Sequence, residues 1–180
     1  QRKLDYNLNN VLIQSKTNQP INKLSLKENL SIINNIKKKS EAARVLGKLS
    51  DAHREVFEVC NEYLILNESE LKTVGIGSPR LAGLHRGKEI VQNLHRFHLF
   101  NWAEIESRAL MQEAKNRVTI SEKLATAQKA LTILDSALQY YPNEAQFLES
   151  EEVVKEFIAS TKVSNWIEQA ERAAFKGNSK

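Results

Sequence analysis

The chain has 180 residues, a net charge of +4, 41% hydrophobic and 27% charged residues, and only six glycines and three prolines. This balance excludes a disordered chain, and the scarcity of helix breakers favours long helices over strands. The single Cys60 excludes an internal disulfide, and no apolar run approaches the roughly 18 residues that a membrane-spanning helix needs. We therefore expect an all-α protein of the cytoplasm with no membrane span.

Residues 1–23 form a polar first segment that is rich in Asn and Gln and contains Pro20. One apolar cluster within it predicts a short helix or a docked arm. The cluster consists of Leu8, Val11, Leu12 and Ile13. Because the chain begins with Gln1 rather than Met, we expect it to be a fragment of a larger protein.

The first arm of a predicted helical hairpin begins at Leu24 and ends near Asn67. Its apolar residues recur every three or four positions over residues 26–36 and again over 45–63, which predicts amphipathic helix. A lysine run that ends at Ser40 separates the two stripes, and Ser is a residue type that starts helices. The sequence therefore leaves open whether this arm is one helix or two.

The second arm is predicted to begin at Ser78 and Pro79. A Ser hydroxyl accepts one of the unpaired N–H groups at a helix start, and Pro has no N–H to leave unpaired at the first helical position. We expect this helix to reach about Asn116, and residues 67–79 to form the connection before it. Neighbouring amphipathic helices bury their stripes against each other, so residues 24–117 are predicted to form a long antiparallel helical hairpin.

Three more helices are expected in residues 118–180. The first is predicted to be capped by Thr119 or Ser121 and to stop ahead of Pro142, because the residue before a proline avoids helical backbone angles. The others are expected over roughly residues 144–160 and from Ser164 to Lys176, with a glycine cap at residue 177.

Two groups of residues in this region each resemble half of a tetratricopeptide repeat. One group has the small, large, small and proline spacing of the second helix of that repeat: Ala130, Leu134, Ala137 and Pro142. The other group resembles the first helix and consists of Trp166, Ala170 and the Gly177-Asn178 turn. An additional helix between the groups departs from the family spacing. The resemblance implies TPR-like helices over residues 118–180, truncated at the C-terminus.

A repeat helix without its partner exposes an apolar seam. We expect such a seam on the last helix, covered either by a protein partner or by the remainder of the parent chain. The candidate binding residues are Trp166, Ala170, Ala173 and Phe175. The sequence therefore favours a non-enzymatic protein–protein interaction or assembly scaffold built from helical hairpins.

An alternative hypothesis is a nucleic-acid-associated helical protein with a basic helix surface. Basic side chains would contact phosphates, and aromatic residues such as Phe97 and Trp102 would offer stacking faces. No motif of a nucleic-acid-binding module accompanies these residues. The candidate anion or nucleic-acid surface consists of Lys37, Lys38, Lys39, Arg80, Arg86, Lys88 and Arg96.

Other patterns give little support to a chemical site. His95 and His98 stand three apart on a predicted helix, a spacing that can chelate a metal, but no HExxH motif or Cys ligand accompanies them. The glycines of residues 75–78 lack the lysine of a phosphate-binding loop, and the glutamates of residues 149–156 lack the spacing of a calcium loop. Cys60 lies on an apolar stripe and is expected to be a packed thiol. We therefore expect no enzymatic activity, metal or cofactor.

Overall fold

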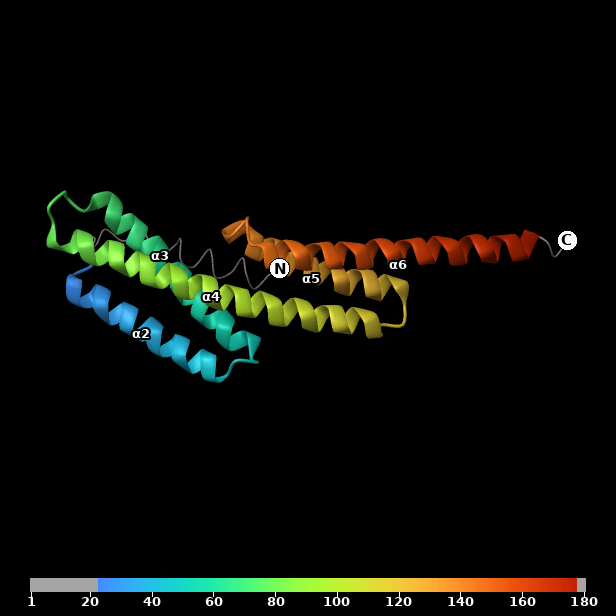
Figure 1. The fold of residues 1–180 in the computed structure, drawn as a ribbon, viewed down its shortest axis with the longest axis horizontal. Coiled ribbons are helices and arrows are strands. Elements are labelled where there is room, and N and C mark those ends of the chain that lie inside the picture. Colours follow the sequence, from blue (N-terminus) through green and yellow to red (C-terminus); the bar gives the residue numbers. More distant parts are fainter. Residues whose placement is uncertain (1–22, 178–180) are drawn as a thin grey trace, which may run out of the picture.

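The computed structural model describes residues 23–177, so all but the last residue of the predicted N-terminal arm, residues 1–23, lies outside the described residues. Within the described part, every regular element is a helix, which confirms the predicted all-α class (Figure 1). None of these helices is long and apolar enough to cross a membrane. They are α2 (Leu26–Val45), α3 (Ser50–Thr73), α4 (Pro79–Asn116), α5 (Ile120–Tyr140) and α6 (Ala145–Gly177).

The range predicted as a hairpin contains α2, α3 and the long α4. In Figure 1, α3 runs toward the left-hand end of the molecule, α4 returns along it, and α2 lies beside both. A capping box between Ser25 and Glu28 starts α2 by pairing two backbone N–H groups. The three helices enclose one apolar core, formed by Ile33, Ile36, Ala43, Val56, Cys60, Tyr63 and Val91.

The first arm of the predicted hairpin is two helices, but the break does not fall at Ser40. Ser40 lies inside α2, is only 2% exposed and hydrogen-bonds through its hydroxyl to Nε2 of His98 at 2.8 Å. The preceding lysines continue the helix because Lys is a good helix former. The chain turns instead at residues 46–49, around Gly47.

The predicted connection over residues 67–79 is wrong in its first half, because α3 continues to Thr73. Asn67 is fully buried, and its side-chain amide donates to the carbonyl of Leu84 at 2.9 Å. Glu70, 5% exposed, forms an ion pair with Arg80. These tertiary contacts hold the last turns of α3 in the helix, and residues 74–78 alone make the connection.

The predicted start of α4 is confirmed. Ser78 is the N-cap, its hydroxyl accepts from the backbone N–H of Arg80, and Pro79 occupies the first helical position. Just before it, Gly77 has a φ of 90°, a left-handed conformation that suits glycine.

A second core lies between the second half of α4, α5 and the first half of α6. Of the two predicted caps for α5, Thr119 is the correct one, and it forms a capping box with Glu122. The alanines on the inner side of α5 are fully buried, so neighbouring helices approach it closely. The core consists of Leu99, Ala103, Ala114, Ala127, Ala130, Leu134, Ala137, Phe147 and Val154.

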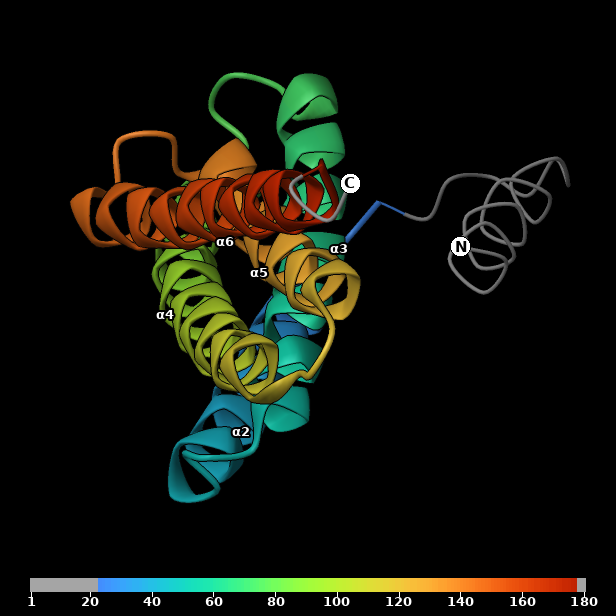
Figure 2. The same ribbon diagram turned by 90° about the vertical axis from the view of Figure 1, so that its right-hand side faces the viewer.

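The two helices predicted over residues 144–160 and 164–176 are one helix, α6, of 33 residues. Neither proline nor glycine occurs between Glu144 and Lys176, so no residue stops the helix. Ser164 is an interior residue of α6 rather than a cap. Figure 1 shows that the C-terminal part of α6 projects beyond the ends of α4 and α5, and Figure 2 shows α6 on the opposite side of the bundle from α2.

Candidate interaction surface on α6

Two neighbouring residues of α4 hold the connection between α5 and α6. Nδ1 of His95 lies 2.8 Å from the hydroxyl of Tyr141, and the guanidinium of Arg96 forms an ion pair with Glu144. Burial lowers the pKa of His95 to about 4, so its imidazole is neutral at pH 7. Phe100 of α4 also stacks on Phe147 at the start of α6, with ring centroids 4.3 Å apart. These contacts fix the direction in which α6 leaves the bundle.

The first half of α6 packs on the bundle along one side of the helix. Phe147 and Val154 are 1% and 2% exposed, and Thr161 and Asn165 continue the same line as half-buried residues. From Trp166 to Lys176 every residue is exposed, which agrees with the projecting helix of Figure 1. The packed side of α6 therefore ends at Asn165.

The apolar residues of the second half of α6 lie on the other side of the helix. Val163 follows Val154 by nine residues (163 − 154), which is about two and a half turns at 3.6 residues per turn and places the two valines on opposite sides. Val163 is 48% exposed and Trp166 is 64% exposed. We call this exposed surface the α6 seam; it consists of Ala159, Val163, Trp166, Ala170 and Ala173, with Ile167 beside them.

Three of the four predicted binding residues lie together on the α6 seam: Trp166, Ala170 and Ala173. Phe175 is 76% exposed but lies about 160° around the helix from Ala173 and about 140° from Ala170, so the structure does not group it with them. Sequence reasoning missed Val163 and Ile167, which are 48% and 54% exposed. The signal was present, because the seam positions alternate by four and three residues, the spacing of a helix–helix interface.

The basic residues of the alternative hypothesis are spread over two helices. Lys37, Lys38 and Lys39 lie on α2, whereas Arg80, Arg86, Lys88 and Arg96 lie along α4. Three of the seven are engaged within the fold. The side chain of Arg80 is 18% exposed, pairs with Glu70 and donates from Nε to the carbonyl of Leu24 at 2.7 Å. Arg96 pairs with Glu144, and Lys39 pairs with Glu55.

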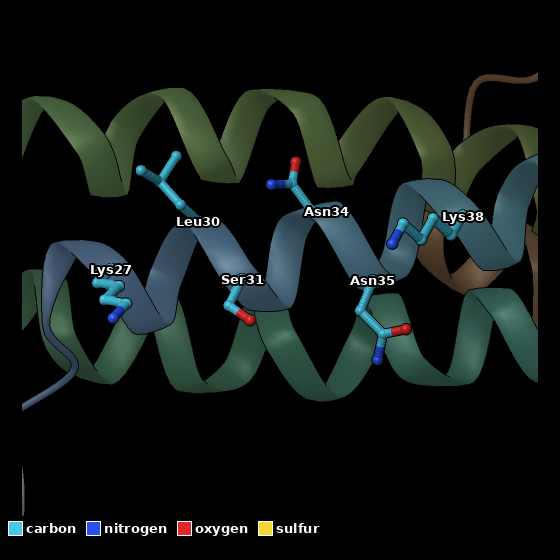
Figure 3. A pocket seen from close by; sticks show the side chains of 6 residues that line it. All are labelled: Lys27, Leu30, Ser31, Asn34, Asn35 and Lys38. Atoms are coloured by element: carbon cyan, nitrogen blue, oxygen red, sulfur yellow. The ribbon is translucent and has the colours of Figure 1, made fainter.

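A cavity of about 580 Å³ opens on the outer surface of α2 (Figure 3). All the described residues that line it come from this one helix, so their side chains do not converge on a ligand from different elements. In Figure 3, Leu30 and Asn34 extend from one side of α2, and Ser31 and Asn35 from the other. The lining residues are Lys27, Leu30, Ser31, Asn34, Asn35 and Lys38.

A buried chain of polar groups joins Ser40 of α2, His98 of α4 and His53 of α3. Nε2 of His98 lies 2.8 Å from the Ser40 hydroxyl, and its Nδ1 lies 2.8 Å from Nδ1 of His53. A Ser–His contact of this kind can activate a nucleophile. Here Ser40 is 2% exposed and sits inside α2, where the surrounding N–H groups are engaged in helical hydrogen bonds. The surroundings of Ser40 leave a substrate no access to its hydroxyl and offer no free N–H groups to an oxyanion. The polar groups of Ser40, His98 and His53 therefore have a structural role.

The histidines that could chelate a metal point to different partners. His95 contacts Tyr141, whereas His98 contacts Ser40 and His53. The part of the chain that the structure describes contains no group of three or more His, Cys, Asp or Glu side chains that could hold a metal ion. Cys60 is fully buried, and burial raises its pKa to about 12, which confirms a packed, protonated thiol.

Comparison with known proteins gave no match to any family model, curated protein or solved structure. Among the described residues, the α6 seam is an exposed apolar surface whose residues follow one another at alternating intervals of four and three.

Proposed function

We propose that this protein is a non-enzymatic protein-interaction or assembly module, in which the helical bundle holds α6 outward to receive a helix from a partner. The observation that carries this proposal is the α6 seam. Its apolar residues are exposed, repeat with the spacing of a helix–helix interface and face away from the side that packs on the bundle. A surface of that kind loses contact with water when another helix packs on it.

The contacts at the base of α6 support the same proposal. The His95–Tyr141 hydrogen bond and the Arg96–Glu144 ion pair fix the connection before α6, and Phe147 anchors its first turn in the core. A helix that is held in place before binding loses less conformational freedom when a partner arrives. The bundle thus presents the seam in a preorganised form.

The proposal also includes the arrangement of the helices. We propose that α3 and α4 form the antiparallel hairpin that supports the module, and that α5 corresponds to the second helix of a TPR-like pair. The full burial of Ala130 and Ala137 supports this assignment, because small residues at these positions allow close packing of helices.

We propose a cytoplasmic location, which suits a protein whose one cysteine is a buried thiol.

A nucleic-acid surface is the less supported alternative. Arg80, Arg96 and Lys39 already pair with carboxylates of the same chain, so their charges are partly neutralised before any phosphate approaches. Binding that weakens steeply with salt and with substitution of Lys37, Lys38 and Arg86 would support this alternative instead.

Site-specific photo-crosslinking tests the interaction proposal. A photoreactive phenylalanine analogue replaces Ile167 on the seam or, as the control, Glu168 on the opposite side, in the protein expressed in its own cells. Both positions are exposed, so the reagent is equally accessible. We expect a protein adduct from position 167 that is absent at position 168. Equal yields from the two positions, or none from either, would refute the interaction function.

A further inference from the structure

We infer that the turn between α2 and α3 docks on the surface of an anionic lipid bilayer, with its aliphatic side chains inserted among the lipid headgroups and its cations on the lipid phosphates. We call residues 45–49 the α2–α3 tip. This is binding to a membrane surface, not a span across it. The tip belongs to the side of the bundle opposite α6 (Figure 2), so the inference does not rest on the proposed interaction function.

Three aliphatic side chains of the α2–α3 tip are exposed. Val45 is 87% exposed, Leu46 is 49% exposed and Leu49 is 56% exposed. Figures 1 and 2 show the end of α2 and the turn after it at the lower edge of the molecule. The tip is therefore free to meet a flat surface at this edge. Insertion at the boundary between headgroups and acyl chains removes these side chains from water.

Leu49 is an unfavourable residue for the position that it occupies. It is the N-cap of α3 and makes no side-chain hydrogen bond to the first turn of that helix. Ser, Thr, Asp and Asn are preferred at an N-cap because their side chains accept from the free N–H groups, and leucine is among the least favoured residues. Leu49 also belongs to neither apolar core. Local rules of this kind are broken most often at functional sites, and a bilayer supplies the apolar contact that the fold does not.

The charge around the tip is complementary to an anionic surface. Residues 37–49 carry five cations and one carboxylate, that of Glu41. Among the residues that the structure describes, neither Lys38 nor Lys48 forms an ion pair. Lys38 precedes Val45 by two turns on the same side of α2, and Lys48 lies in the tip itself, so cations flank the aliphatic side chains. Each such cation near an anionic leaflet strengthens binding roughly fivefold.

The outer surface of α2 continues this basic surface. The cavity there contains Lys27 and Lys38, and no carboxylate stands among its described lining residues (Figure 3). Cations on one helix suit headgroups that are spread over a plane, whereas a small ligand is held by side chains that converge from several elements. Residues 37–49 contain no aromatic residue on which a base could stack. The aliphatic tip thus favours a lipid surface over a nucleic acid.

Vesicle co-sedimentation tests the inference with the 180-residue chain. Vesicles of phosphatidylcholine alone are compared with vesicles of phosphatidylcholine and phosphatidylserine in equal amounts. We expect binding to the anionic vesicles that weakens in high salt, and much less binding to the neutral ones. Leu49→Ser should weaken binding at least about fivefold by removing an inserted side chain, and Lys48→Gln roughly fivefold by removing one cation. Ile65→Ser is the control, since Ile65 is 64% exposed on the same helix but far from the tip, and it should not change binding.

Leu49→Ser also separates a loss of binding from a loss of folding. Because serine is a favoured N-cap, this variant should unfold at a higher urea concentration than the wild type while it binds vesicles more weakly. No binding of the wild type to anionic vesicles, or equal binding by the wild type and Leu49→Ser, would overturn the inference. A chain that ignores vesicles but binds a single-stranded oligonucleotide, with a loss of affinity in Lys48→Gln, would assign the surface to nucleic acid instead.

A fluorescent probe tests insertion directly. Val45→Cys is labelled with a polarity-sensitive fluorophore, while the buried Cys60 stays unlabelled. We expect the emission to shift to shorter wavelength when phosphatidylserine vesicles are added, because the probe leaves water. The same probe on Ile65→Cys should show no shift. Unchanged emission from position 45 in the presence of bound vesicles would refute insertion of the tip.

Discussion

Substitution of Gly87 by alanine should destabilise the fold strongly, even though alanine is the better helix former. Gly87 lies inside α4 and is buried against the neighbouring helices. A Cβ atom built there collides with the hydroxyl of Tyr63 and lies 2.8 Å from Cδ1 of Ile33. The Tyr63 hydroxyl cannot retreat freely, because it donates to Oδ1 of Asn29 at 2.8 Å and accepts from the amide of Asn67 at 3.1 Å.

The magnitude follows from opposing contributions. Alanine in place of glycine stabilises a helix interior by about 1 kcal/mol. Overpacking a buried site costs about 1–3 kcal/mol, and displacing a buried hydroxyl from its partners costs about 1–3 kcal/mol more. These contributions leave a net loss of about 1–5 kcal/mol in the free energy of unfolding for Gly87→Ala, centred near 3 kcal/mol and measured by urea denaturation and circular dichroism.

Gly83→Ala is the matched control, one turn earlier on the same helix. Its Cβ would meet Cδ2 of Leu26, the end of a flexible side chain that is 41% exposed and can move. Gly83→Ala should therefore be neutral or stabilise by up to about 1 kcal/mol. In a Tyr63→Phe background, which removes the colliding hydroxyl, Gly87→Ala should cost less than in the wild type. A Gly87→Ala variant as stable as the wild type would refute this account of the helix contact.

Three further predictions concern the buried polar groups. Burial lowers the pKa values of His95 and His98 from 6.5 to about 4, so the stability that each neutral imidazole contributes is present above pH 6.5 and is lost as the pH falls toward 4. Unfolding measured between pH 7 and pH 4 should show a loss of roughly 3 kcal/mol per histidine, and constant stability would contradict the buried neutral state. Glu70→Ala should destabilise by about 3 kcal/mol in the same assay because it strands the partly buried Arg80, whereas a change below about 1 kcal/mol would mean that the pair is solvated like a surface pair. Asn67→Ala should cost about 1–3 kcal/mol through its lost hydrogen bonds, and full protection of the last turn of α3 from hydrogen exchange in this variant would refute its assigned role.

The helix starts were predictable because their signals are local. Ser78 and Pro79 and the capping residue Thr119 act on backbone groups within three residues of themselves, so sequence alone identifies them. The continuation of α3 was not predictable in this way. Asn67 and Glu70 look like residues of a connection until their partners, the carbonyl of Leu84 and the guanidinium of Arg80, are brought against them by the fold.

The continuity of α6 was within reach of the sequence. No proline or glycine separates Phe157 from Val163, and the hydroxyls of Ser160 and Thr161 donate to the carbonyl of Phe157 inside the helix instead of capping a new one. Ser164 is of a residue type that starts helices, which favours a second helix from sequence alone, but in the structure it is an interior residue of α6. The side that packs on the bundle could be assigned only after α5 and α6 were placed together.

That change of side within one helix limits what can cover the α6 seam. Val154 is 2% exposed against the bundle, and Val163 lies on the opposite side of the same helix. Turning α6 to bury Val163 in the bundle would expose Phe147 and Val154, which are among the most buried residues of the second core. Both apolar lines can be covered at once only if a separate helix approaches from outside the bundle. The two-sided pattern of α6 therefore supports the proposed interaction function, in which a partner helix covers the α6 seam.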